Sequence, residues 1–77
     1  MKEFIEFMAK NLVDSPDKVE VELKITEENK VIFALKVAKE DVGKVIGKQG
    51  KTAQAMRTLL TAIAAKEGKK ALLEILQ

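Results

Sequence analysis

Residues 18–26 alternate between polar and apolar side chains without a break. A strand has a side-chain period of two, so this segment predicts a β-strand with one core-facing side. Its apolar side consists of Val19, Val21, Leu23 and Ile25. The polar segment 27–30 predicts a turn, and we therefore expect the next strand to return as a hairpin.

Residues 31–38 predict that second strand, and both of its faces are apolar. One face carries Val31, Phe33, Leu35 and Val37, and the other carries Ile32 and Ala34. A strand that is covered on both faces belongs inside a sheet. We therefore expect a central position for it.

Helical segments flank the hairpin. Residues 2–13 predict a helix from the spacing of Phe4, Ile5, Met8 and Leu12, and we expect Phe4 and Phe7 in the core. Pro16 ends this helix, because the residue before a proline disfavours the helical conformation.

The second half of the chain predicts two helices and a strand. A short helix spans residues 40–46, with Asp41 as an N-cap or first-turn acid. A long Ala-rich helix spans residues 51–67 and ends before Gly68. Residues 70–76 are short and apolar, and we interpret them as a third strand.

The predicted fold class is therefore α+β, in the order α-β-β-α-α-β, as a single domain of residues 1–77. The two helices between the second and third strands are long enough for a crossover. The third strand can thus lie parallel to the second, which gives a three-stranded mixed sheet with the helices packed on one face.

Composition excludes several kinds of chemistry. The 77 residues contain no Cys, His, Trp or Tyr, so disulfides, His-based triads and His or Cys zinc sites are ruled out. No apolar run spans a membrane, and Glu3 and Glu6 argue against a signal peptide. We expect a cytoplasmic protein with no membrane contact, no enzymatic activity, no cofactor and no bound metal.

Charge is distributed unevenly along the chain. Residues 1–41 hold seven lysines and ten acidic residues, whereas residues 42–77 hold seven basic and two acidic residues. The stretch 42–66 carries five basic residues and no acid. Such a one-signed stretch indicates an anionic partner or, equally, a solvated basic helix face.

The segment Gly47-Lys48-Gln49-Gly50 interrupts the two predicted helices. Glycines permit a tight turn with positive φ and the close approach of another backbone. The turn leads into a helix N-terminus, whose free N–H groups favour phosphate. Lys44, Lys48 and Lys51 add positive charge at the same place.

Two nucleotide-binding patterns were tested against this loop. The end of the Walker A pattern fits Gly50-Lys51-Thr52, but position 45, where its first glycine is required, is Val. The dinucleotide pattern G-x-G-x-x-G fails at the same residue. Both patterns follow a strand, whereas this loop follows a helix, so the sequence disfavours nucleotide hydrolysis.

The stretch Gly43-Lys44-Val45-Ile46-Gly47-Lys48-Gln49-Gly50 resembles the motif of KH domains, and the element order resembles their type II arrangement. The whole chain is similar to the small bacterial single-KH RNA-binding proteins of the KhpA type. The family resemblance also rests on Leu12-Val13-x-x-Pro16 and Arg57-Thr58-Leu59-Leu60.

The resemblance implies a clamp for about four single-stranded nucleotides, with the GxxG loop against their backbone. Gly47, Lys48, Gln49 and Gly50 would hold phosphates, while Val45, Ile46 and Ala53 would line the groove. Ile32 and Ala34 would form its other wall. Many KH domains have a larger aliphatic residue at the position of Ala53, so the groove is expected to be shallower here. The resemblance therefore leaves open whether the protein selects a particular RNA sequence.

Three residues in this region have two readings each. Lys44 and Arg57 either extend the phosphate contact or are solvated. Gly43 either admits a close approach or is a packing glycine, and we favour packing.

The long helix has two apolar stripes. Ala53, Met56, Leu60, Ile63 and Ala64 form the expected inward stripe, and Ala55, Leu59 and Ala62 form a second one. A helix that is apolar on two sides is usually covered on both. We therefore expect a homodimer whose interface contains Ala55, Leu59, Ala62 and Ile63.

Two functions remain open. The first is a single-stranded RNA-binding protein that acts as a dimer, as a post-transcriptional regulator or RNA chaperone. The second is a protein-interaction adaptor with weak or secondary RNA binding, which pairs with another, larger KH-containing protein as the resemblance implies.

Overall fold

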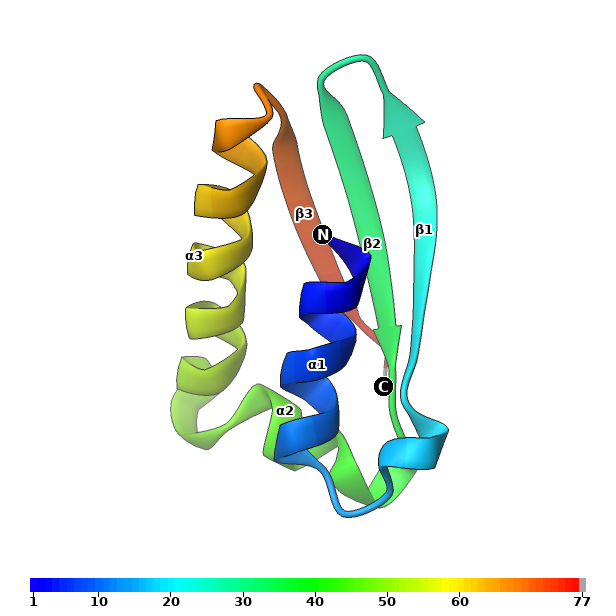
Figure 1. Cartoon of the computed structure of the whole chain (residues 1–77). Coiled ribbons are helices and arrows are strands. Elements are labelled where there is room, and N and C mark those ends of the chain that lie inside the picture. Colours follow the sequence, from blue (N-terminus) through cyan, green and yellow to red (C-terminus); the bar gives the residue numbers. More distant parts are fainter. Residues whose placement is uncertain (77) are drawn as a thin grey trace.

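The sheet contains three strands in the order β1-β2-β3 (Figure 1). They are β1 (Glu20–Glu27), β2 (Lys30–Lys36) and β3 (Lys70–Ile75). β1 pairs antiparallel with β2, and β3 pairs parallel with β2. The mixed sheet and the central position of β2 are both confirmed.

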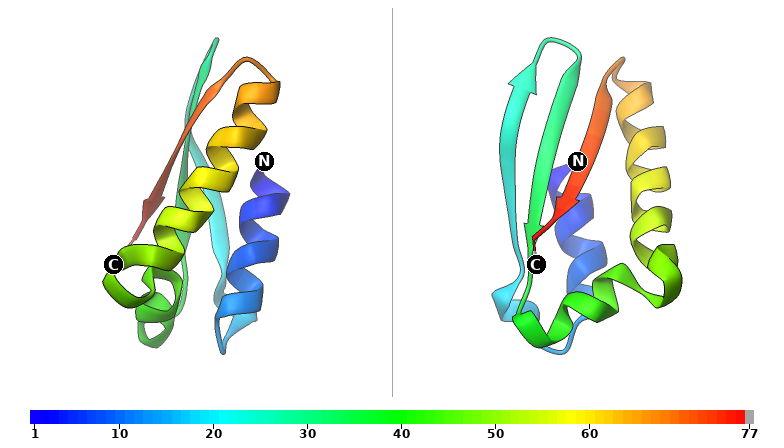
Figure 2. Two further views of the ribbon diagram at one scale, coloured as in Figure 1. Left: turned by 90° about the vertical axis from the view of Figure 1, so that its left-hand side faces the viewer. Right: turned by 180° about the vertical axis from the view of Figure 1, so that it is seen from behind.

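Three α-helices accompany the sheet: α1 (Lys2–Leu12), α2 (Val42–Ile46) and α3 (Lys51–Lys66). α1 and α3 pack on the same face of the sheet, as the edge-on view in Figure 2 shows. The order α-β-β-α-α-β and the α+β class are confirmed. In the part of the chain described, no helix is both long and apolar enough to cross a membrane.

The computed structural model describes residues 1–76. The prediction of a single domain over residues 1–77 includes Gln77, which lies outside the described residues. Single-turn 3-10 helices connect the main elements at Pro16–Lys18, Lys39–Asp41 and Lys48–Gly50.

The core lies between β2 and the two long helices. The helix-facing side of β2 is buried, and Leu35 is fully inaccessible. α1 contributes Ile5 and Ala9, and the inward stripe of α3 contributes Met56, Leu60 and Ala64. The stripe follows the helical period, because positions three and four residues apart share one face.

The apolar side of β1 is less buried than the alternation predicts. Val21 is buried, but Leu23 and Ile25 are 47% and 43% exposed. A β-bulge between Leu23 and Ile25 places Ile25 opposite Ile32, on the face away from the helices. A bulge inserts one residue and so reverses the alternation beyond it. The prediction of one core-facing side was therefore wrong for this half of the strand.

Phe7 was also predicted to be in the core, and this is wrong because its side chain is 68% exposed. It follows the buried Ile5 by two residues, and positions two apart on a helix point to different sides. Phe4 is partly buried and packs against the core, as expected.

The sheet face away from the helices is partly apolar. Ile25, Ile32 and Leu72 lie in register across the three strands. Beside them, Lys24 of β1 pairs with Glu74 of β3 at 3.1 Å. Ala34 is the β2 residue paired with Glu74 and is only 2% exposed, so the ion pair spans β2 above it.

Replacing a buried and an exposed leucine tests this account of the core. We expect Leu35→Ala to lower the free energy of unfolding by about 2–5 kcal/mol, because it leaves a cavity at a fully buried site. Leu23→Ala is the matched control and should cost less than about 1 kcal/mol. Urea denaturation of both variants measures the difference, and equal losses would contradict the assignment.

Candidate nucleic-acid interface

The loop Gly47–Gly50, called here the GKQG loop, reverses the chain between α2 and α3. Three of its residues have positive φ: Gly47 at 78°, Gln49 at 58° and Gly50 at 74°. Left-handed backbone favours glycine, and at Gln49 it is a local strain of the kind found at binding sites. The tight turn foreseen from the two glycines is present.

Gly47 is required for a second reason. Its φ of 78° and ψ of 173° lie in a region that is almost restricted to glycine. A Cβ atom at this position would lie 2.9 Å from the backbone nitrogen of Thr52 and would also meet the Thr52 side chain. A Cβ at Gly50 would meet nothing within 4 Å. The first glycine therefore allows α3 to start close to the end of α2.

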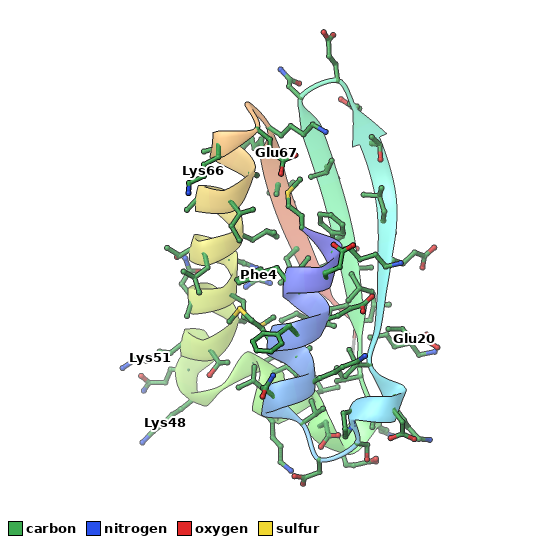
Figure 3. All side chains as sticks on the ribbon, in the orientation of Figure 1. Phe4, Glu20, Lys48, Lys51, Lys66 and Glu67 are labelled. Carbon is green, nitrogen blue, oxygen red and sulfur yellow. The ribbon has the colours of Figure 1, made fainter. Side chains whose placement is uncertain are left out.

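The N-terminus of α3 opens onto this loop. Within residues 1–76 no side chain caps it, and its first turn carries no acidic residue. The first N–H groups of a helix have no intrahelical partner, and the helix dipole places positive charge there. The exposed Lys48 and Lys51 extend outward from the same end of α3 (Figure 3). Loop, helix end and lysines together form an anion-binding arrangement.

Lys44 does not join this group of free cations. Its Nζ forms an ion pair with Asp14 and lies 3.6 Å from Oδ1 of Asp41. The hydrogen bond with Asp14 raises the pKa of Lys44 above its ordinary value. Lys44 is thus charged but already paired with two carboxylates. Of its two predicted readings, phosphate contact is not favoured by this arrangement.

Asp41 is the N-cap residue of α2, as predicted, but its side chain bonds to a distant segment. It precedes α2, but its carboxylate makes no capping hydrogen bond to that helix. Instead Oδ2 accepts a hydrogen bond from the backbone N–H of Ser15 at 3.1 Å, and the side chain is fully buried. The carboxylate therefore ties the start of α2 to the segment that follows α1. The predicted N-cap position of Asp41 is confirmed, although its side chain makes no capping hydrogen bond.

The apolar residues predicted to line a groove divide into two groups. Val45 and Ala53 are 0% and 3% exposed, so they support the loop from inside the core. Ile46 is half-buried and keeps accessible surface. Ala34, predicted for the opposite wall, is buried below the Lys24–Glu74 pair, and Ile32 lies on the open sheet face. The prediction of an Ile32–Ala34 wall was therefore wrong.

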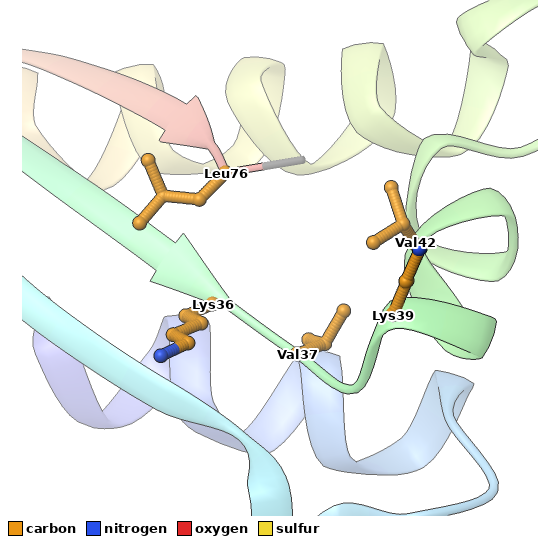
Figure 4. A pocket seen from close by; sticks show the side chains of 5 residues that line it. All are labelled: Lys36, Val37, Lys39, Val42 and Leu76. Carbon is orange, nitrogen blue, oxygen red and sulfur yellow. The ribbon is translucent and has the colours of Figure 1, made fainter.

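The structure shows a different hollow beside α2. It measures about 580 Å³ and is lined by Lys36, Val37, Lys39, Val42 and Leu76. Val42 and Leu76 face each other across it, with Val37 at its base (Figure 4). None of these five residues was predicted from the sequence to be part of a binding site. The spacing of Val42 and Ile46 could have indicated part of this hollow, because Val42 lies one helical turn before Ile46 on the same side of α2.

Arg57 lies at the free edge of β3. Its Nε donates a hydrogen bond to the carbonyl oxygen of Leu73 at 3.3 Å. A second hollow of about 400 Å³ lies there, lined by Arg57, Leu60, Thr61, Ala71, Leu72, Leu73 and Glu74. Because a guanidinium has five N–H donors, Arg57 can hold this carbonyl and still contact a ligand in the hollow.

The second stripe of α3 is on the surface. Ala55, Leu59 and Ala62 are exposed, Leu59 by 48%, and Ile63 beside them is half-buried. The four predicted interface residues therefore form a continuous strip along one helix. Among residues 1–76, no three Asp or Glu side chains come together in a way that could hold a metal ion.

A three-stranded mixed sheet, two helices joined by a GxxG loop and the order α-β-β-α-α-β together define a KH domain. The family model described as KhpA/KhpB, KH domain matches residues 2–75. The chain belongs to this family.

Curated relatives span nearly the full chain. A protein of Clostridium acetobutylicum named RNA-binding protein KhpA is 53% identical over 76 residues, covering 99% of this chain and 100% of the relative. The protein of that name from Caldanaerobacter subterraneus subsp. tengcongensis is 54% identical with the same coverage. That of Chlamydia trachomatis serovar D is 46% identical over 77 residues, covering 100% of this chain and 97% of the relative. No solved structure matches the chain.

The two loop glycines should differ in their tolerance of alanine. We expect Gly47→Ala to lower the free energy of unfolding by about 2–3 kcal/mol, because strain and contact with Thr52 act together. Gly50→Ala should cost about 1 kcal/mol, from left-handed strain alone. Chemical denaturation compares the two, and a larger loss at Gly50 would refute the assigned geometry.

Proposed function

We propose that this protein binds single-stranded RNA and clamps about four nucleotides at the GKQG loop. Gly47, Lys48, Gln49 and Gly50 hold the phosphates, assisted by Lys51. The protein performs no catalysis. The name RNA-binding protein, carried by relatives that are 46–54% identical, supports RNA as the ligand.

One observation carries this proposal. The N-terminus of α3, which has no side-chain cap, directly follows a strained loop, and two exposed lysines lie beside it. N–H groups that are oriented by the fold bind an anion without the cost of ordering a flexible side chain. The backbone N–H groups are thus the rigid part of the site, and the two lysine side chains are its flexible part. Both suit a phosphate chain more than a particular base.

The two hollows mark the surface along which the bound RNA runs. One lies beside α2 and is bordered by Lys36 and Lys39, and the other lies between α3 and β3 and contains Arg57. The second hollow is lined by residues of β3, and the first by Leu76, which directly follows β3. A strand anchored at the loop reaches aliphatic walls in the first hollow and a guanidinium in the second. Ile46 supplies the accessible apolar surface nearest the loop.

In the cell such a module acts on transcripts. We infer a cytoplasmic post-transcriptional regulator or RNA chaperone, since a shallow backbone clamp fits many single strands. A dimer would carry two GKQG loops and would raise avidity without new contacts.

A charge reversal at the loop tests the RNA site. We expect the double variant Lys48→Asp, Gln49→Asp to weaken binding of a labelled single-stranded RNA pool about tenfold or more, because two carboxylates then face the phosphates. Native affinity should fall with salt, with a log–log slope of roughly −0.7 per phosphate neutralised. Fluorescence anisotropy at two salt concentrations measures both, and circular dichroism checks folding.

The matched control changes the same kinds of residue at the opposite end of the sheet. Lys70→Asp with Asn29→Asp also replaces one lysine and one amide, near the β1–β2 turn. This variant should bind RNA with nearly native affinity. If both double variants lose affinity equally, the contact is diffuse and the loop is not the clamp.

A second candidate function rests on the exposed strip of α3. Ala55, Leu59 and Ala62 leave an apolar helix side uncovered in the single chain. We propose that this strip and Ile63 form a homodimer interface, or pair with a larger KH-containing protein. In the adaptor form of this proposal, pairing is the main role and RNA binding is secondary.

A charge on this strip should separate a dimer. We expect Leu59→Asp to shift the sedimentation of the protein from dimer to monomer, because an unpaired carboxylate is costly to bury. Gln54→Asp, on another exposed side of α3, should leave the dimer intact. A native protein that sediments as a monomer at every concentration would count against the homodimer.

A further inference from the structure

The middle of the sheet face away from the helices is not used by the proposed RNA clamp. Its centre is formed by Ile25, Ile32 and Leu72, called here the apolar row, with one residue from each strand. Ile25 and Leu72 are exposed, and Ile32 is half-buried. Seen edge-on in Figure 2, both long helices lie on the other side of the sheet. Two sheets can pack face to face through such apolar side chains.

Acidic and basic side chains are balanced around the apolar row. Opposite charges lie next to each other across the strands, as Glu20 with Lys36, Glu27 with Lys30, and Lys24 with Glu74. Two further charged residues of this face, Glu22 and Lys70, have opposite signs. A surface that takes up RNA carries an excess of positive charge, as the start of α3 does. The sheet face has no such excess, so its electrostatics favours a protein surface with a complementary order of charges.

Strand β3 carries opposite charges at equal distances from the apolar row. Lys70 precedes Leu72 by two residues and Glu74 follows it by two, so all three point to the same face of the sheet. Both charged residues are exposed. A two-fold axis along the apolar row reverses the direction of the strands. It therefore places Lys70 of one copy over Glu74 of the other, and this contact is formed twice.

The same axis suits the other two strands. It places the apolar rows of the two copies over each other, and it places Lys30 of one copy over the small Ala34 of the other. On β1, Glu27 approaches the part of the other copy that carries both Glu22 and Lys24. The opposite charges of these two residues offset each other there.

We propose that a second copy of this chain packs on the open sheet face, around a two-fold axis along the apolar row. The inference does not depend on the RNA clamp. The exposed strip of α3 lies on the helix side of the molecule, so both surfaces can be covered at once. Two different two-fold contacts on one chain join dimers into larger particles, which present more GKQG loops to one RNA.

Sedimentation of the native protein without RNA, from about 10 μM to about 1 mM, tests this contact. The apolar row is small and predicts a weak interface, so an additional, larger species should form only toward the upper concentration. Lys70→Glu alone and Glu74→Lys alone each oppose like charges across the axis. Each should raise the dissociation constant of the larger species about tenfold. Circular dichroism checks that both variants fold.

A mixture of the two variants gives the sharpest comparison. An equimolar mixture of Lys70→Glu and Glu74→Lys should associate more tightly than either variant alone, because opposite charges then meet at both contacts. Lys10→Glu makes the same charge change at an exposed position of α1 and is the control. It should assemble like the native chain.

The outcomes separate this contact from the other proposals. If the native chain forms no larger species, or if both sheet variants assemble like the native chain, the contact is refuted and the clamp is unaffected. Leu59→Asp should remove association through α3 but keep the step at high concentration, and loss of that step would also refute the sheet contact. If Lys70→Glu instead loses RNA affinity at concentrations where the protein is not assembled, the face binds RNA and the inference is wrong.

Discussion

The sharp reversal between α2 and α3 is the constraint on which the remaining site depends. It uses positive φ at Gly47, Gln49 and Gly50, and the absence of a Cβ at Gly47 lets Thr52 approach. Because the turn is this tight, α3 starts beside the end of α2 and runs back along the sheet. Arg57 can then reach the edge of β3. The same turn leaves the first N–H groups of α3 without a side-chain cap, and this is where we propose that an anion binds.

The lysines near the loop differ in their surroundings, because one is held in ion pairs and two are exposed. Asp41 is buried and holds the Ser15 N–H, while Asp14 and Asp41 together neutralise Lys44. These interactions fix α2 relative to the segment after α1. Lys48 and Lys51 remain exposed at the other side of the turn. The protein thus separates one structural cation from two that are available to a ligand, although all three are close in sequence.

Sequence periodicity predicted the two long helices and the first two strands, because these elements show a clear period of 2 or 3.6. The third strand and the mixed sheet followed instead from a short apolar run and from the length of the crossover. Periodicity did not identify what depends on contacts between distant residues. The bulge after Leu23 became visible only from strand pairing, and it moved Ile25 to the open face. The pairing of Lys44 with Asp14 joins residues thirty positions apart. Burial of Val45 and Ala53 likewise reflects how α2 and α3 pack, whereas the two glycines of the loop could be read locally.

The central claim is that RNA contacts the backbone of the GKQG loop and the start of α3. An NMR titration of the protein with a single-stranded RNA of about four nucleotides tests this directly, through the amide shifts of each residue. The account predicts the largest shifts at Gly47–Lys51, with smaller ones at Val42 and Leu76 in the adjoining hollow. Shifts confined to Ile25, Ile32 and Leu72 on the open sheet face would contradict it, as would an unchanged loop at saturating RNA.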